Sequence, residues 1–129
     1  MRIALPILII IITLSEALGQ FLLNKHYNIS QNKTHYHGIP IKLLPLITWL
    51  LYGICTYLLL ISYKYTSMSK AEVYWDALSA LIVPVIGAMF FGNTINVVGW
   101  CGIVLIILGT LLVAGEKKIY KLIKQKILN

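Results

Sequence analysis

Four apolar runs divide this chain and constrain its fold more than any other feature. They cover residues 3–23, 43–63, 71–91 and 97–114. About 20 apolar residues form a helix long enough to cross the roughly 30 Å hydrocarbon layer of a bilayer. Because a chain inside that layer must satisfy its own backbone hydrogen bonds, each run is expected to be an α-helix. The sequence therefore predicts an all-α, four-helix transmembrane bundle over residues 1–115.

The composition excludes several classes of protein. The chain is 59% hydrophobic and 12% charged, whereas a soluble domain is about 25% charged. A water-soluble enzyme, a nucleic-acid-binding module and a disordered chain are thereby excluded. His26, His35 and His37 share the first loop, but they have no cysteine or acidic neighbour that would complete a metal site. There is also no nucleophile triad, so we expect no enzymatic activity, no metal, no cofactor and no nucleic-acid partner.

The distribution of basic residues predicts the orientation. Four spans place both termini on one side of the membrane. Eight basic residues fall on that side: Arg2, Lys64, Lys70, Lys117, Lys118, Lys121, Lys124 and Lys126. Three fall on the other side: Lys25, Lys33 and Lys42. The positive-inside rule then places both termini in the cytoplasm and the protein in the cytoplasmic membrane. Residues 116–129 are expected to form a basic amphipathic tail that contacts anionic lipid.

Glu16 is the most informative polar residue. At about 1.5 Å per residue, it lies about 18 Å from the start of the first run. A carboxylate at that depth costs about 3 kcal/mol on the mildest scale, so it must face a helix interface or a water-filled cavity. Burial favours the neutral form of a carboxyl group, which makes Glu16 a candidate for proton exchange. The alternative is a structural hydrogen bond between helices.

The third run places acidic and aromatic residues on one helix face. Glu72, Trp75, Asp76 and Ser79 follow the i, i+3, i+4, i+7 spacing. An aromatic ring attracts an ammonium group, and carboxylates neutralise it. This pattern predicts a cation site, although Glu72 is close enough to the start of its span to reach the lipid headgroups instead. In the second run, Tyr52 and Tyr57 are further candidates for the same site.

The fourth run carries small residues at helical spacing. Gly102, Leu105, Ile106 and Gly109 follow the i, i+3, i+4, i+7 pattern. Small residues at this spacing allow two helix backbones to approach closely, so the pattern predicts a helix-packing or dimer face.

With these residues in view, the sequence resembles the small multidrug resistance family of the drug/metabolite transporter superfamily. The resemblance covers residues 3–25 and 43–115, 96 of the 129 residues. The motifs that carry it are the E-x-x-G of Glu16-Ala17-Leu18-Gly19, the following Lys25, the aromatic residues Tyr52, Tyr57 and Trp75, the turn Phe90-Phe91-Gly92-Asn93, and the Gly102-x-x-Leu105-Ile106-x-x-Gly109 pattern. The resemblance implies an antiparallel dimer in which protons and a cationic substrate compete for the paired Glu16 carboxylates.

Two branches of that superfamily are similar to parts of this chain. Trp75-Asp76 resembles a Trp-Glu pair in one subunit of the heterodimeric spermidine exporters. Gly19-Gln20 and Trp100-Cys101-Gly102 resemble stretches of the aminoarabinose-lipid flippase subunits. Glu72 stands where the family has a pocket tyrosine, so acid replaces part of the aromatic lining.

These observations lead to three functional hypotheses. The first is proton-coupled export of small organic cations, polyamine-like or quaternary ammonium compounds, by a homodimer or a heterodimer with a sister subunit. The second is a subunit of a flippase for a lipid-linked amino sugar. The third is a membrane subunit that transports nothing and uses its acidic residues only to fix helix packing.

Overall fold

The chain folds into four long helices. In the computed structural model, which describes residues 3–29 and 34–128, they are α1 (Ala4–Ile29), α2 (Leu44–Ser62), α3 (Met68–Phe91) and α4 (Val97–Leu128). Within these described residues, all four helices are long and apolar enough to cross a membrane. This confirms the prediction of an all-α protein with four apolar helices of membrane-spanning length.

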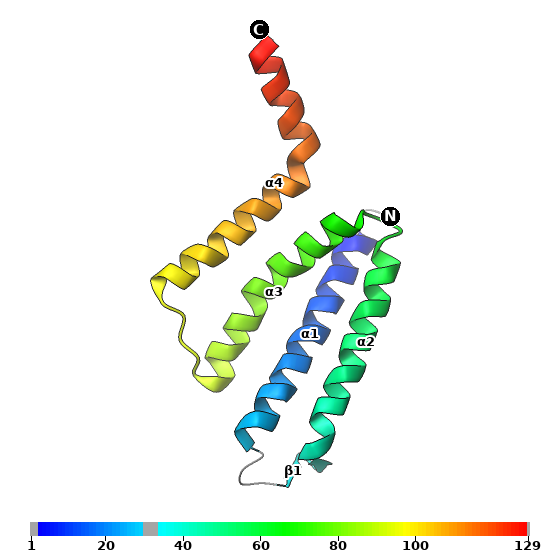
Figure 1. The fold of residues 1–129 in the computed structure, drawn as a ribbon, viewed down its shortest axis with the longest axis vertical. Helices are drawn as coiled ribbons and strands as arrows, with labels where there is room; N and C mark the ends of the chain where they lie inside the picture. The colour runs from blue at the N-terminus through cyan, green and yellow to red at the C-terminus, as the bar shows by residue number, and fades with distance from the viewer. Residues whose placement is uncertain (1–2, 30–33, 129) are drawn as a thin grey trace.

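The α1 helix lies between α2 and α3, and α4 packs against α3. Figure 1 shows α1 and α2 side by side, α3 inclined against α1, and α4 beyond α3. The packing between helices becomes weaker along the chain. In the most apolar stretch of α1, 33% of the residues are buried, against 6% in that of α4. Most of the surface of α4 therefore has no partner within the described chain.

Small and polar residues join α1 to α2. The Thr48 hydroxyl donates to the Gly19 carbonyl at 3.1 Å, and the Cys55 thiol donates to the Ile12 carbonyl at 3.4 Å. Thr48, Cys55 and Ile12 are all buried. Short side chains that also donate to a neighbouring backbone are typical of helix contacts in membranes. These contacts hold α1 and α2 together on either side of Glu16, at Ile12 and at Gly19.

The α1 helix is longer than hydropathy predicts. It continues six residues past the expected end at residue 23, to Ile29. Polar residues can extend a helix beyond the hydrocarbon layer because their side chains find partners there. Asn28 donates to the Asn24 side chain at 2.7 Å, and His26 Nδ1 lies 2.9 Å from the Ile41 carbonyl oxygen.

A short hairpin that the sequence analysis did not predict precedes α2. Strands β1 (His35–Tyr36) and β2 (Ile39–Pro40) pair antiparallel, and a 3₁₀ turn, η1 (Ile41–Leu43), leads into the helix. The two residues between the strands, His37 and Gly38, have φ angles of 48° and 81°. Positive φ at both central residues is the geometry of a tight two-residue hairpin turn.

Both ends of α3 have capping residues. The Ser67 side chain accepts a hydrogen bond from the Lys70 backbone N–H at 3.4 Å, so the helix begins at residue 68 rather than at the predicted 71. At the other end, Gly92 adopts a left-handed conformation with φ 65°. A left-handed glycine ends a helix without steric penalty. Residues 92–96 then connect α3 to α4 without a regular turn, so GNTIN, a tight-turn signal in the sequence, forms an open connection.

The α4 helix continues through the lysine-rich residues that the sequence analysis treated as a separate tail. It reaches Leu128 instead of ending near residue 114. Gly115 has no positive φ, so no left-handed cap ends the helix there. Figure 1 shows α4 changing direction in its orange part before the red C-terminal end projects away. Lys70 and Glu116 pair at 3.0 Å and connect the start of α3 to this bend.

Candidate functional site

The Glu16 carboxylate accepts three hydrogen bonds. Trp75 donates its indole N–H to Oε2 at 2.6 Å, and Ser79 donates its hydroxyl to the same oxygen at 2.8 Å. Gln20 donates its amide N–H to Oε1 at 2.9 Å. Charge-assisted hydrogen bonds of this length are about twice as strong as neutral ones. The Glu16 cluster, defined as Glu16, Gln20, Trp75 and Ser79, therefore stabilises a carboxylate between α1 and α3.

Helix geometry explains how the cluster forms. Gln20 is one turn after Glu16 on α1, and Ser79 is one turn after Trp75 on α3, so each pair shares a helix face. Glu16 is only half-buried. Its carboxylate is thus ordered by three donors while part of the side chain stays accessible, an arrangement that allows an external proton or cation to reach it.

Tyr52 is connected to the cluster through Gln20. The Gln20 amide N–H lies 3.4 Å from the Tyr52 hydroxyl, which brings α2 into the network. Gln20 and Ser79 were not among the predicted site residues. Ser79 shares the predicted face of Trp75, and Gln20 follows Glu16 at i+4, so helical spacing was the signal for both.

The glycine of the E-x-x-G motif has a packing role. A Cβ atom on Gly19 would lie 3.2 Å from Thr48 Cγ2 and 3.3 Å from Tyr52 Cε2. Both distances are tighter than ordinary van der Waals contact. Gly19 therefore allows α2 to approach α1 closely enough for Tyr52 to reach Gln20.

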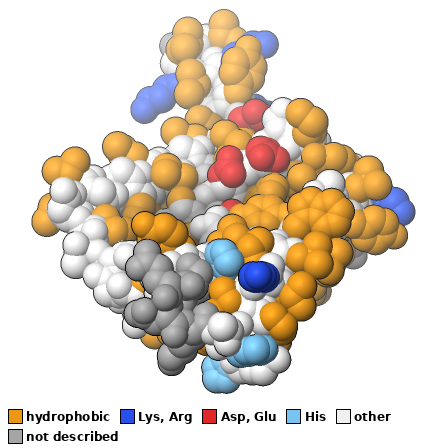
Figure 2. All heavy atoms as spheres, turned by 60° about the horizontal axis from the view of Figure 1, so that its bottom comes forward, with side chains coloured by type: hydrophobic (Ala, Val, Ile, Leu, Met, Phe, Trp, Pro, Cys, Tyr) orange, Lys and Arg blue, Asp and Glu red, His pale blue; other side chains and the backbone are white. Residues whose placement is uncertain are grey.

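The other predicted site residues lie outside this cluster. Glu72 and Asp76 are exposed on α3, and Tyr57 is 65% exposed on α2. None of the three makes a hydrogen bond to the Glu16 cluster within the described part of the chain. Figure 2 shows acidic side chains gathered near the middle of one face, below the projecting end of α4. Glu72 and Asp76 therefore form an open acidic surface on α3, outside the Glu16 cluster.

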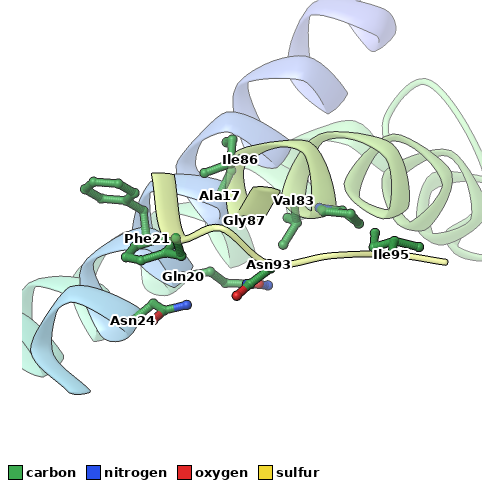
Figure 3. Close-up of a pocket in the computed structure, with 11 residues that line it drawn as sticks. Ala17, Gln20, Phe21, Asn24, Val83, Ile86, Gly87, Asn93 and Ile95 are labelled. Atoms are coloured by element: carbon green, nitrogen blue, oxygen red, sulfur yellow. The ribbon is translucent and has the colours of Figure 1, made fainter. Parts of the chain in front are cut away.

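A cavity extends from the cluster toward the end of the molecule where the hairpin lies. It has a volume of about 260 Å³ and lies between α1, α3 and the loop before α4. Its polar lining comes from the amides of Gln20, Asn24 and Asn93. In Figure 3 the Gln20 and Asn93 amides lie near each other at its centre. Gln20 thus belongs both to the Glu16 cluster and to this cavity.

The predicted packing face on α4 is uncovered. A Cβ atom on Gly102 or on Gly109 would meet nothing within 4 Å. Leu105 is 68% exposed and Ile106 is 45% exposed. The four residues have the spacing that allows close helix contact, and no other helix of the described chain covers Leu105 or Ile106.

Comparison of the chain with known protein families, with curated proteins and with solved structures gives no match. The geometry of the Glu16 cluster therefore carries the functional argument.

Proposed function

We propose that this chain is a subunit of a proton-coupled exporter of small organic cations and that Glu16 is its coupling carboxylate. The observation that supports this most is the set of three donors that converge on a half-buried carboxylate in a helix of membrane-spanning length. An acidic residue at membrane depth has ion or proton handling as its default role.

Competition for one carboxylate would couple the two ligands. A proton on Glu16 removes the negative charge that attracts an ammonium group, and a bound ammonium group opposes protonation. Because Glu16 cannot hold both ligands at once, proton entry on one side would drive release of the cation there. Alternating exposure of this site to the two sides of the membrane would then give antiport.

The donors around Glu16 fit such an exchange. When Glu16 is charged, Trp75 and Ser79 both stabilise Oε2. When Glu16 is protonated on Oε1, the Gln20 amide can turn and offer its oxygen as an acceptor, because a carboxamide carries both a donor and an acceptor. The cluster can therefore satisfy either protonation state without a change in helix packing.

The acidic surface favours substrates that carry more than one positive charge. Glu72 and Asp76 are exposed one turn apart on α3, beside the helix face of Trp75. A polyamine-like substrate could neutralise Glu16 with one ammonium group and this acidic pair with another. A quaternary ammonium compound, with a single charge, would use Glu16 alone.

The proposed assembly is a dimer, either of two identical chains or with a sister subunit. The uncovered Gly102 and Gly109 face and the low burial of α4 support it.

Proton flux in proteoliposomes tests the proposed function. Spermidine and a quaternary ammonium dye are each offered to the wild-type protein, to Glu16→Gln and to Glu116→Gln. The last variant is the matched control because it neutralises an acid outside the cluster. We expect cation-driven proton flux in the wild-type protein and in Glu116→Gln, and a fall to the background of empty liposomes in Glu16→Gln. Equal flux in all three proteins would contradict the proposal.

The alternative role for Glu16 is structural, since its three hydrogen bonds connect α1 to α3. Thermal unfolding in detergent separates the two roles. Glutamine has the same shape as glutamate, and its amide oxygen can still accept from Trp75 and Ser79. If Glu16 serves transport, Glu16→Gln loses flux and keeps a melting temperature close to that of the wild-type protein. A large fall in melting temperature would support the structural role.

A further inference from the structure

Lys25 has an unusual environment. Its ammonium nitrogen lies 5.7 Å from the ring centroid of Phe21, 5.9 Å from that of Tyr36 and 5.4 Å from that of Phe91. A cation within about 6 Å of a ring centroid is attracted by the face of that ring. Three rings from α1, β1 and the end of α3 thus surround one ammonium group.

Carboxylates do not compensate this charge. Within residues 3–29 and 34–128, the only ion pair joins Lys70 to Glu116. Lys25 is half-buried, and the contacts of its ammonium group are with aromatic rings. An ammonium group held against several aromatic rings is the arrangement by which proteins recognise organic cations such as choline and methylated lysine.

We call Phe21, Tyr36 and Phe91 the aromatic cage. Further ring contacts hold these three side chains in place. Phe21 packs against Phe91 with centroids 5.3 Å apart, and against the edge of Phe90 at the same distance. Tyr36 contacts the His37 ring at 4.5 Å. Rings fixed by their neighbours lose little conformational freedom when a ligand enters between them.

The aromatic cage is also connected to the Glu16 cluster. Phe21 and Phe91 line the cavity of about 260 Å³ that contains Gln20, and Gln20 donates to Glu16. Figure 3 shows Phe21 at one side of this cavity and Gln20 at its centre. A continuous lining therefore leads from the proposed coupling carboxylate to the aromatic cage.

We propose that the aromatic cage is a second binding site for small organic ammonium ions, and that Lys25 is its tethered occupant, which an arriving cation displaces. The proposal rests on the proposed handling of organic cations but concerns a different site. Because Lys25 follows the Glu16 span, the cage would receive the cation at the end of the molecule where the hairpin lies.

The test measures binding at the aromatic cage in proteins whose Glu16 carboxylate has been removed. All proteins carry Glu16→Gln and are reconstituted in nanodiscs of phosphatidylglycerol, which has no ammonium headgroup. Tetramethylammonium is the probe, and the proton resonances of the Lys25 ε-methylene report occupancy. Ring currents should shift these resonances upfield while Lys25 is in the cage. We expect the shift to disappear as tetramethylammonium saturates the site.

Two lysine variants separate displacement from general charge effects. Lys25→Gln and Lys42→Gln each remove one positive charge on the same side of the membrane. Calorimetry should show roughly tenfold tighter tetramethylammonium binding in Lys25→Gln, because the resident cation is gone, and no change in Lys42→Gln. Equal affinities in the two variants would overturn the proposal.

A wall variant tests the rings themselves. Tyr36 belongs to the hairpin and lies outside the contacts between helices, so Tyr36→Leu should fold normally while Tyr36→Phe keeps the ring. In the Lys25→Gln background we expect Tyr36→Leu to weaken binding by roughly tenfold and Tyr36→Phe to retain it. Retained binding in Tyr36→Leu would overturn the assignment.

The source of the ammonium group is tested in a second set of nanodiscs. Choline headgroups in phosphatidylcholine carry the same chemistry as the free cation. We expect free tetramethylammonium to displace Lys25 in both lipids. Displacement of Lys25 by phosphatidylcholine alone, with no response to the free cation, would contradict a site for soluble cations. Since every protein in this test lacks Glu16, the result is independent of whether Glu16 drives proton flux.

Discussion

Trp75 donates its indole N–H to the Glu16 carboxylate at 2.6 Å, across the contact between α3 and α1. The residue expected to offer its ring face to a cation thus also offers its edge to the carboxylate. A cation at Glu16 would meet a carboxylate that already accepts three hydrogen bonds, and it would bind at the acceptor position that remains on Oε1.

Removal of the indole N–H should weaken the α1–α3 contact. Trp75→Phe keeps an aromatic ring but leaves Oε2 with Ser79 as its remaining donor. A hydrogen bond to a charged group is worth about 1.5 to 3 kcal/mol, and we expect a loss of stability in that range. Denaturant unfolding in mixed micelles measures it. Trp100→Phe is the matched control because Trp100 is exposed on α4. An equal loss in both variants would show that the N–H contributes nothing specific.

A methyl group at Gly19 should separate α1 from α2. Gly19→Ala places a Cβ atom 3.2 Å from Thr48, so we expect a loss of about 1 to 2 kcal/mol from overpacking. In Gly53→Ala the new Cβ meets nothing within 4 Å, and the better helix propensity of alanine should leave stability unchanged or raise it by up to about 1 kcal/mol. Thermal unfolding of the two variants, measured in the same detergent, checks the difference. A Gly19→Ala variant as stable as Gly53→Ala would contradict the close contact.

The uncovered face of α4 predicts an assembly defect without a folding defect. Gly102→Val and Gly109→Val each add a side chain where the protomer has open space. We expect chemical crosslinking in membranes to show at least a several-fold loss of dimer, with the helix content unchanged. Gly53→Val is the control, since it carries the same helix-propensity cost at a position outside the motif. Full crosslinking in both α4 variants would exclude this face as the interface.

The orientation should depend on the lysines of α4. Replacement of Lys117, Lys118, Lys121, Lys124 and Lys126 by glutamine leaves three basic residues on each side of the membrane. We expect the protein to insert in both orientations, because the charge bias that selects one of them is gone. Protease protection of a C-terminal tag in sealed vesicles measures the two populations. A single retained orientation would show that other features determine the topology.

Hydropathy was sufficient to find the four helices but not their ends. The hydropathy of a window of residues reflects the free energy of moving their side chains from water to an apolar phase. The ends of a helix depend instead on local hydrogen bonds. Thus Ser67 starts α3 early, and α1 continues to Ile29 through side-chain contacts of Asn24 and His26. The α4 helix passes residue 114 because Gly115, which could have ended it, does not adopt a left-handed conformation.

The sequence pointed to the centre of the candidate site because one of its residues is costly to bury. Glu16 stands out because a carboxylate in an apolar run requires partners, and Trp75 was already a candidate on the basis of its helix face. Gln20 was missed because an amide in such a run costs less and gives no comparable signal. Sequence spacing alone also could not separate Ser79, which reaches Glu16, from Asp76, which is exposed on the same helix.

Because the Gly102 and Gly109 face of α4 is uncovered, lipid acyl chains would contact it in a single chain inside a membrane. When a second helix packs on this face, contacts between the helix and lipid are replaced by contacts between two helices. The extent of such pairing therefore depends on the ratio of protein to lipid and on the thickness of the bilayer, rather than on the concentration of protein in the surrounding water.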